Sequence, residues 1–224
     1  MNKKLLIIIL ILTVFGLIVL SSAGIVDSQK KFGSPYYYLT HQLLYGIIPG
    51  LVGMFIISRI DYRFWKKISL FILMGALALM IMIFIPSFGH GLKGATRWIN
   101  LGIFSFQPAE ILKLSLIIYL AAWFGGRDER SKKWSYGMMP FLIILAFVAL
   151  LLFLQPDIGT LIIVSFISLG VYFMAGPSYK QFVGIILVLF LALSVIIVVE
   201  PYRFERLKTF WDPSADPRGA SYQI

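Results

Sequence analysis

The sequence predicts an all-α polytopic membrane protein with about seven transmembrane helices. The chain of 224 residues is 59% hydrophobic but only 13% charged, and its mean hydropathy is +0.89. A soluble domain is about half apolar and a quarter charged, so the low charged fraction indicates an integral membrane protein. Uncharged stretches separate the groups of charged residues, and most of these stretches are long enough to cross a bilayer.

The uncharged stretches define seven candidate spans. They are 5–26, 32–58, 68–92, 114–126, 134–156, 158–179 and 181–199. The fourth has only 13 residues, whereas a span needs about 20. It can be extended only back to Pro108, which suits the first turn of a helix because proline lacks a backbone N–H. The fourth helix is therefore predicted over 108–124, and this places Glu110 and Lys113 within the span.

The first stretch has the basic start, apolar run and small residues of a secretory signal peptide. Its 22 uncharged residues are long for a signal core and more spans follow, so we interpret it as a retained helix. With the N-terminus in the cytoplasm, eleven Lys and Arg lie inside and five outside, before a tail at 200–224. This bias favours that orientation. The four basic residues of the outer tail are an exception to this bias, and they suggest an anionic ligand on the outer side.

Composition excludes several functional classes. A net charge of +10 would indicate nucleic acid for a soluble protein, but in a membrane protein it indicates topology or contact with anionic lipid. The chain has no cysteine, so a disulfide or a thiolate-metal site is excluded, and its two histidines are too few and too isolated to suggest a metal cluster. It also lacks a phosphate-binding loop, a dinucleotide fingerprint and a nucleophile triad.

Glu110 and Lys113 lie three residues apart near the outer end of the fourth span. One interpretation is a structural ion pair that begins the helix, since residues three apart share a helical face. The other is a polar site that lines a groove, because ionisable groups within a membrane span are usually functional. The sequence leaves both open.

Asp157 is the only charge between Lys133 and Lys180. That interval holds two spans, so the turn between them must fall at Pro156–Gly159. Asp157 is then either the N-cap of the following helix or a direct ligand contact, and both interpretations stay open.

Two segments are predicted outside the spans. Residues 87–107 contain four glycines and are interpreted as a loop with turns, in which Trp98 suits an interfacial position. The tail is either a short surface helix or a solvated segment. It carries apolar residues at helical spacing with basic residues between them: Arg203, Phe204, Arg206, Leu207, Lys208, Phe210 and Trp211. Because no closing element follows, a fragment of a longer protein is the simplest explanation of the sequence.

Three stretches resemble a known family. "GATRWINLGIFSFQPAEILKL", "LQPDIGT" and "PYRFERLKTFWDPSADPRGASYQI" resemble the N-terminal part of the SEDS proteins (shape, elongation, division and sporulation), which include FtsW, RodA and SpoVE. The resemblance covers nearly the whole chain, and "QPAEILKLSLIIYLA" and "FMAG" favour the FtsW branch over RodA. It implies a SEDS-type helical bundle, a single membrane domain over 1–224, and the start of the large extracytoplasmic loop at 200–224.

The resemblance also implies roles for individual residues. Those expected to bind substrate or line the central cavity are Arg97, Glu110, Lys113, Asp157, Arg203 and Arg206. Those expected to belong to family motifs with structural roles are Trp98, Gln107, Pro108, Pro156, Gly159, Tyr222 and Gln223. The aspartate proposed as the family's general base lies further along the outer loop, beyond Ile224, together with about three helices. No catalytic residue is therefore expected in this chain, and we expect it to be inactive alone.

SEDS proteins are peptidoglycan glycosyltransferases that polymerise lipid II at the outer face of the bacterial cytoplasmic membrane. A sugar hydroxyl attacks the anomeric carbon of a second substrate and a lipid diphosphate leaves, and outward-facing basic groups would neutralise that diphosphate. The resemblance implies a class B penicillin-binding protein, divisome or elongasome proteins and membrane lipid as partners. No cofactor is evident, and a divalent cation requirement stays open.

Two other functions are compatible with these motifs. One is a flippase for the lipid-linked precursor, and the other is a non-catalytic scaffold that binds division proteins. A flippase needs a polar path through the membrane centre. The charges here lie near the outer edge and the centres of the spans are nearly all apolar, which favours the enzyme.

Overall fold

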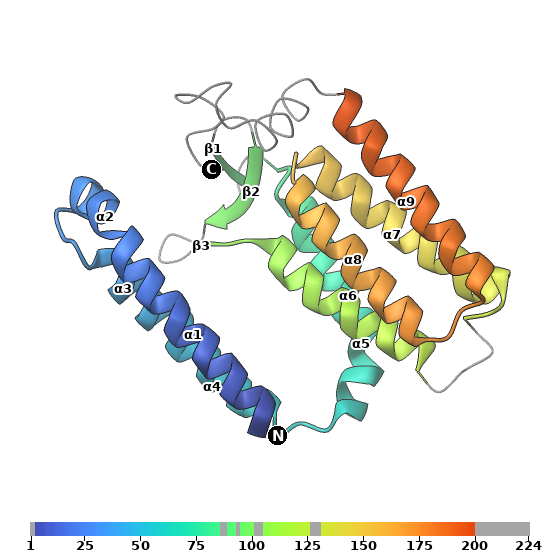
Figure 1. Cartoon of the computed structure of the whole chain (residues 1–224), viewed down its shortest axis with the longest axis horizontal. Helices are drawn as coiled ribbons and strands as arrows, with labels where there is room; N and C mark the ends of the chain where they lie inside the picture. Colours follow the sequence, from blue (N-terminus) through green and yellow to red (C-terminus); the bar gives the residue numbers. More distant parts are fainter. Residues whose placement is uncertain (1–2, 86–88, 93–94, 101–104, 126–130, 200–224) are drawn as a thin grey trace. The chain divides into compact units, whose positions relative to one another are not determined.

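The computed structural model describes residues 3–85, 89–92, 95–100, 105–125 and 131–199 (Figure 1). The chain divides into two compact units, Met1–Phe64 and Trp65–Ile224, and each is described here by itself. Both are predominantly helical, which confirms the predicted fold class.

The first unit contains two long helices joined by a short one. The elements are α1 (Lys3–Ala23), α2 (Ile25–Phe32), α3 (Tyr37–Gln42), the π-helical turn η1 (Leu43–Ile47) and α4 (Ile48–Ile57). α3, η1 and α4 follow one another without a break to form a helix of 21 residues, and α1 packs along α3. α1 buries no side chain. Such a surface suits lipid, which is as apolar as the side chains that face it.

The second predicted span begins later than the uncharged stretch does. Gly33 ends α2 in the left-handed conformation (φ 69°), and its N–H donates to the Gln29 carbonyl at 3.1 Å. Glycine adopts this conformation without a steric penalty, and Pro35 then cannot continue the helix. The long helix therefore begins at Tyr37 rather than at residue 32.

Asp27 connects α2 to α3. Its Oδ2 accepts hydrogen bonds from Lys31 Nζ at 2.9 Å and from the Tyr38 hydroxyl at 3.0 Å. These donors, Lys31 first, hold the pKa of Asp27 below its usual range. The carboxylate therefore stabilises this connection above the ordinary pKa of an aspartate, and the contribution is lost as pH falls through the lowered value.

We expect Tyr38→Phe to raise the pKa of Asp27 towards the ordinary value, because the carboxylate loses one of its two side-chain donors. NMR titration of the Asp27 carboxyl measures this directly. Tyr36→Phe is the matched control, since no side-chain bond from Tyr36 is recorded in the described part of the chain. An unchanged Asp27 titration in Tyr38→Phe would show that the hydroxyl does not support the carboxylate.

The second unit is a helical bundle with a small sheet at one end (Figure 1). Its helices are α5 (Tyr62–Met82), which begins at the boundary of the units, α6 (Pro108–Phe124), the π-helical turn η2 (Trp134–Met138) with α7 (Met139–Leu154), α8 (Ile158–Met174) and α9 (Tyr179–Val199). α8 packs against both α6 and α7. The core includes Leu112, Leu116 and Leu120 of α6, which lie four residues apart on one helical face and are fully buried.

Residues 89–106 contain three short strands, β1 (Gly89–Leu92), β2 (Ala95–Asn100) and β3 (Ser105–Phe106). They form an antiparallel sheet in the order β1-β2-β3, with Gly89 opposite Ile99 and Ile99 opposite Phe106. The sequence predicted only a loop with turns here, so the sheet is a correction. Strand pairing depends on partners along the chain and leaves little trace in a glycine-rich segment.

The third predicted span, taken from the uncharged stretch 68–92, differs from the observed helix at both ends. α5 begins at Tyr62 and includes Arg63, Lys66 and Lys67 in its first turns, and it ends at Met82. Long basic side chains can cover the end of an apolar helix while their charged groups reach the interface, so the charges did not mark its start. Residues 89–92, which belong both to the end of the uncharged stretch and to the predicted loop 87–107, form β1.

Four helical segments in the described residues are long and apolar enough to cross a membrane: Lys3–Ala23, Tyr37–Ile57, Tyr62–Met82 and Trp134–Leu154. Ile158–Met174 and the Tyr179–Ala192 part of α9 are shorter apolar segments. α6 has the predicted bounds, with Pro108 at its first position and Glu110 in its first turn. Each predicted stretch thus contains a helix, and the number of crossings stays a prediction.

Candidate functional site

The sheet directs Arg97 towards the turn between α7 and α8. Side chains alternate between the two faces of a strand, so Arg97 and Ile99 of β2 point to one face and Trp98 to the other. Ile99 is buried, whereas Trp98 is 48% exposed. β2 also contacts α6. Burial of Ile99 therefore fixes the side of the strand from which the Arg97 guanidinium reaches the turn.

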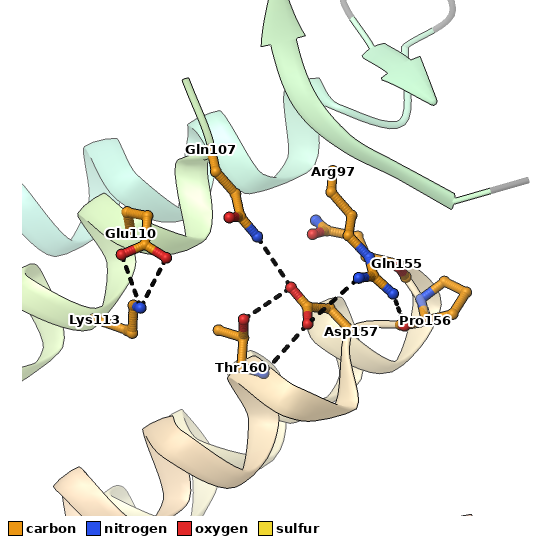
Figure 2. A network of polar contacts seen from close by, with 8 residues as sticks. All are labelled: Arg97, Gln107, Glu110, Lys113, Gln155, Pro156, Asp157 and Thr160. Atoms are coloured by element: carbon orange, nitrogen blue, oxygen red, sulfur yellow. Dashed lines mark hydrogen bonds and ion pairs between the residues drawn. The ribbon is translucent and has the colours of Figure 1, made fainter. Parts of the chain in front are cut away.

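Arg97 binds the carboxyl end of α7. Its Nε donates to the Gln155 carbonyl at 3.3 Å, and its Nη2 donates to the Pro156 carbonyl (Figure 2). The last carbonyls of a helix lack partners within it and carry partial negative charge, so a guanidinium there satisfies hydrogen bonds and complements the helix dipole. Arg97 Nη1 also lies 3.9 Å from Asp157 Oδ1.

Asp157 is the N-cap of α8, as one of the two sequence interpretations predicted. Its Oδ1 accepts from the Thr160 backbone N–H at 3.2 Å, and its Oδ2 accepts from the Thr160 hydroxyl at 2.8 Å. The side chain is only 7% exposed. A carboxylate at this position satisfies N–H groups that the first turn leaves unpaired and complements the positive end of the helix dipole.

Gln107 connects this turn to the start of α6. It is the residue before Pro108, and its Nε2 donates to Asp157 Oδ2 at 3.1 Å. Gln155, which is buried, donates from its Nε2 to the Met80 carbonyl near the end of α5 at 3.2 Å. The turn at 155–157 is thus bonded to β2, α5 and α6. We call Arg97, Gln107, Gln155, Asp157 and Thr160 the junction network.

Glu110 and Lys113 form a separate pair on α6 (Figure 2). Lys113 Nζ lies 2.8 Å from the Glu110 carboxylate, so the predicted ion pair between residues three apart is present. The Lys113 side chain is 21% exposed and that of Glu110 is 59% exposed. The two side chains bond to each other, and within the described residues neither of them bonds to a member of the junction network. The structure therefore separates predicted site residues into two groups.

The remaining predicted residues have simpler positions. Pro108 is buried at the first position of α6, and Pro156 lies in the turn. Gly159 is the second residue of α8, where an added Cβ would meet only Asp157 Oδ1 at 4.0 Å. Four residues predicted from the tail lie outside the described residues: Arg203, Arg206, Tyr222 and Gln223.

Sequence reasoning missed Gln155 and Thr160 as members of the network. Thr160 stands three residues after Asp157, which is the spacing at which a cap meets the backbone it serves. Gln155 precedes Pro156 in the motif "LQPDIGT", but its bond to Met80 depends on the approach of α5. In the described ranges no group of three or more His, Cys, Asp or Glu is placed to hold a metal ion.

A family model described as "Cell cycle protein", which covers FtsW, RodA and SpoVE, matches residues 3–224. The chain belongs to the FtsW/RodA/SpoVE family. The resemblance found in its motifs is thereby confirmed, and the junction network and the Glu110–Lys113 pair are features of a member of this family.

Relatives in the family carry FtsW names. A "Probable peptidoglycan glycosyltransferase FtsW" from Nitrosomonas europaea is 37% identical over 221 residues, which cover 96% of this chain and 56% of the relative. Proteins with the same name from Geobacter sp. and Legionella pneumophila are both 34% identical, over 96% and 95% of this chain and 58% and 54% of their own lengths. The chain thus spans a little over half the length of these relatives.

Solved structures support the same fold. One, described as "Structural coordination of polymerization and crosslinking by a peptidoglycan synthase complex", matches with a TM-score of 0.65 and 29% identity, over 93% of this chain and 62% of the other. The rod shape determining protein RodA of Thermus thermophilus matches with a TM-score of 0.59 and 27% identity, over 79% and 58%. The helical bundle of this chain is therefore similar to the corresponding part of family members.

Proposed function

We propose that this chain is part of a peptidoglycan glycosyltransferase that polymerises lipid II at the outer face of the bacterial cytoplasmic membrane. The observation that carries the proposal is the Glu110–Lys113 pair, partly exposed in the first turns of a helix that begins beside the junction network. Membership of a family whose relatives are named peptidoglycan glycosyltransferases supports it. The N-terminus is proposed to lie in the cytoplasm, as the Lys and Arg bias favours.

The contacts divide the predicted site residues by role. Arg97 already donates to two carbonyls and lies beside Asp157, so its guanidinium is largely occupied within the protein. A lysine ammonium has three donors, and the Glu110 carboxylate does not exhaust them. We therefore assign Lys113 to the substrate diphosphate and Arg97 with Asp157 to holding the helices that surround it.

A lipid diphosphate gains negative charge as it leaves the anomeric carbon. A positioned cation stabilises that charge in the transition state more than in the ground state, which is what accelerates the chemical step. Glu110 keeps the Lys113 ammonium at a fixed place on α6 and partly compensates the cost of a cation near lipid. The apolar helices beside it suit a polyprenyl chain.

The distribution of polar groups favours polymerisation over translocation. The helical segments Met139–Leu154 and Ile158–Met174 contain no charged residue, and the junction network lies at one end of α8. A flippase would need polar groups along the path of the headgroup through the membrane. As a partner we propose a class B penicillin-binding protein, since one similar structure is of a complex that couples polymerisation to crosslinking.

The proposal is tested with the full-length protein that contains this sequence, purified with and without a class B penicillin-binding protein. We expect lipid II to be converted into glycan polymer, resolved by gel electrophoresis. Vesicles that carry fluorescent lipid II on one side measure translocation in the same preparation. Translocation without polymer would contradict the proposal and favour the flippase.

A further inference from the structure

A groove lies between the N-terminal part of the helix formed by η2 and α7 and the N-terminal part of α9. The two helices run side by side (Figure 1). The groove has a volume of about 330 Å³. The residues that matter here are Trp134, Met138 and Leu142 from the first helix and Lys180, Gly184 and Ile185 from α9. It is remote in sequence from the residues assigned above to substrate.

The floor of the groove is apolar and open. Met138 and Ile185 are buried in the core of the unit, and Leu142 packs against that core. At Gly184 an added Cβ would meet no atom within 4 Å, so the backbone there borders empty space. Such a floor offers dispersion contacts to an alkyl chain but no hydrogen bonds to a polar group.

The mouth of the groove is basic and is held in place. Lys180 lines it, Lys133 directly precedes Trp134, and both are exposed. No acidic partner is recorded for either lysine in the described part of the chain. Gln181 Nε2 donates to the Lys132 carbonyl at 2.9 Å, and the Ser131 hydroxyl donates to the Ala175 carbonyl at 2.7 Å. These bonds tie the segment before η2 to the C-cap of α8 and to the first turn of α9.

We propose that this groove binds an anionic phospholipid. The phosphate lies at Lys180 and Lys133, and one acyl chain lies over Met138, Leu142 and Gly184. Trp134, 59% exposed at the mouth, suits the headgroup level, where tryptophan is enriched. The charge of the mouth decides between occupants, because an uncharged lipid or an apolar helix would gain nothing from two lysines. On the predicted topology the site faces the cytoplasmic leaflet, whose anionic lipids attract basic residues.

Native mass spectrometry of the full chain, released from nanodiscs with equal amounts of phosphatidylglycerol and phosphatidylethanolamine, tests the proposal. We expect phosphatidylglycerol to be retained preferentially. Lys180→Gln should weaken its retention about fivefold, and the double variant with Lys133→Gln roughly thirtyfold, since each lysine near an anionic headgroup contributes about 1 kcal/mol. Lys180→Arg should restore retention, and Lys67→Gln on α5 is the matched control.

A second variant tests the acyl chain independently of charge. Gly184→Leu places a side chain in the open floor and should weaken retention about fifteenfold if it displaces about two methylenes. Gly170→Leu on α8, where an added Cβ also meets nothing within 4 Å, is its control. Equal retention of both lipids by the wild-type chain would overturn the proposal, and so would unchanged retention in Lys180→Gln and Gly184→Leu.

Discussion

Lys113→Ala in the full-length protein is expected to reduce lipid II polymerisation by a factor of about 10²–10³, the usual cost of removing one group that stabilises a developing anion. Membrane insertion and expression should survive, because the pair that Lys113 makes with Glu110 contributes only about 0.2–0.5 kcal/mol when a helix is considered alone. The measurement is the initial rate of polymer formation at equal amounts of inserted protein.

Three further variants separate the possible roles of Lys113. Lys113→Arg keeps the positive charge and should retain part of the activity, although a guanidinium presents its donors differently. Glu110→Gln keeps a hydrogen-bond acceptor for Lys113 and should be milder than Lys113→Ala. Lys67→Ala, on the exposed surface of α5, should leave the rate unchanged. A Lys113→Ala enzyme with normal turnover would restrict the pair to beginning the helix.

The parts of this site that the sequence predicted depend on local chemistry. Pro108 marked the start of α6 because a proline is tolerated only in the first turn of a helix. The uncharged stretch 114–126 alone is too short to cross the membrane, so the helix had to begin earlier. The N-cap was one of the two interpretations that the sequence left open for Asp157, and it came from the lack of room between two spans and from the helix that follows. In both cases the decisive partners lie within four residues.

The parts that the sequence did not predict depend on distant partners. The pairing of β2 with β1 and β3 has no strong pattern in a segment rich in glycine, yet it determines where Arg97 points. Gln107 and Asp157 are 50 positions apart, and Gln155 and Met80 are 75 apart. No periodicity in one chain encodes such distances, so the motifs did not predict that the Glu110–Lys113 pair stands apart from Arg97, Gln107 and Asp157.

The junction network shows why a charged residue is retained in an apolar bundle. Arg97 lies at the negative end of one helix dipole, at α7, and Asp157 lies at the positive end of the next, at α8. Each charge therefore has a compensating dipole as well as a charged neighbour. The connection between α7 and α8 is only three residues long, and the network fixes the direction in which it turns.

Asp157→Ala is expected to lower the free energy of unfolding by about 3 kcal/mol. The loss of a helix cap contributes about 1 kcal/mol. The remainder comes from donors of Gln107, Thr160 and Arg97 that lose their acceptor in a buried turn, at about 1–3 kcal/mol for each group left unsatisfied, less where water reaches it. The free energy of unfolding in mixed micelles measures the effect.

Two variants distinguish the cap from the wider network. Asp157→Asn keeps an oxygen for the Thr160 N–H but loses the charge, so we expect the free energy of unfolding to fall by about 1 kcal/mol. Asp61→Ala removes an exposed carboxylate that, within the described residues, accepts a side-chain hydrogen bond only from the Arg63 N–H at 2.7 Å. Its effect on the free energy of unfolding should be no larger than the loss of an ordinary helix cap. If Asp157→Ala cost no more than Asp61→Ala, Asp157 would be a cap alone.

A double-mutant cycle between Arg97→Ala and Asp157→Ala then tests whether β2 and the turn act as one unit. Residues in one hydrogen-bond network couple by about 0.5–3 kcal/mol, whereas independent sites add. We expect coupling in that range, because removal of Asp157 should loosen the turn whose carbonyls bind Arg97. Strict additivity would mean that the sheet and the turn are held separately, and that Arg97 only satisfies the end of α7.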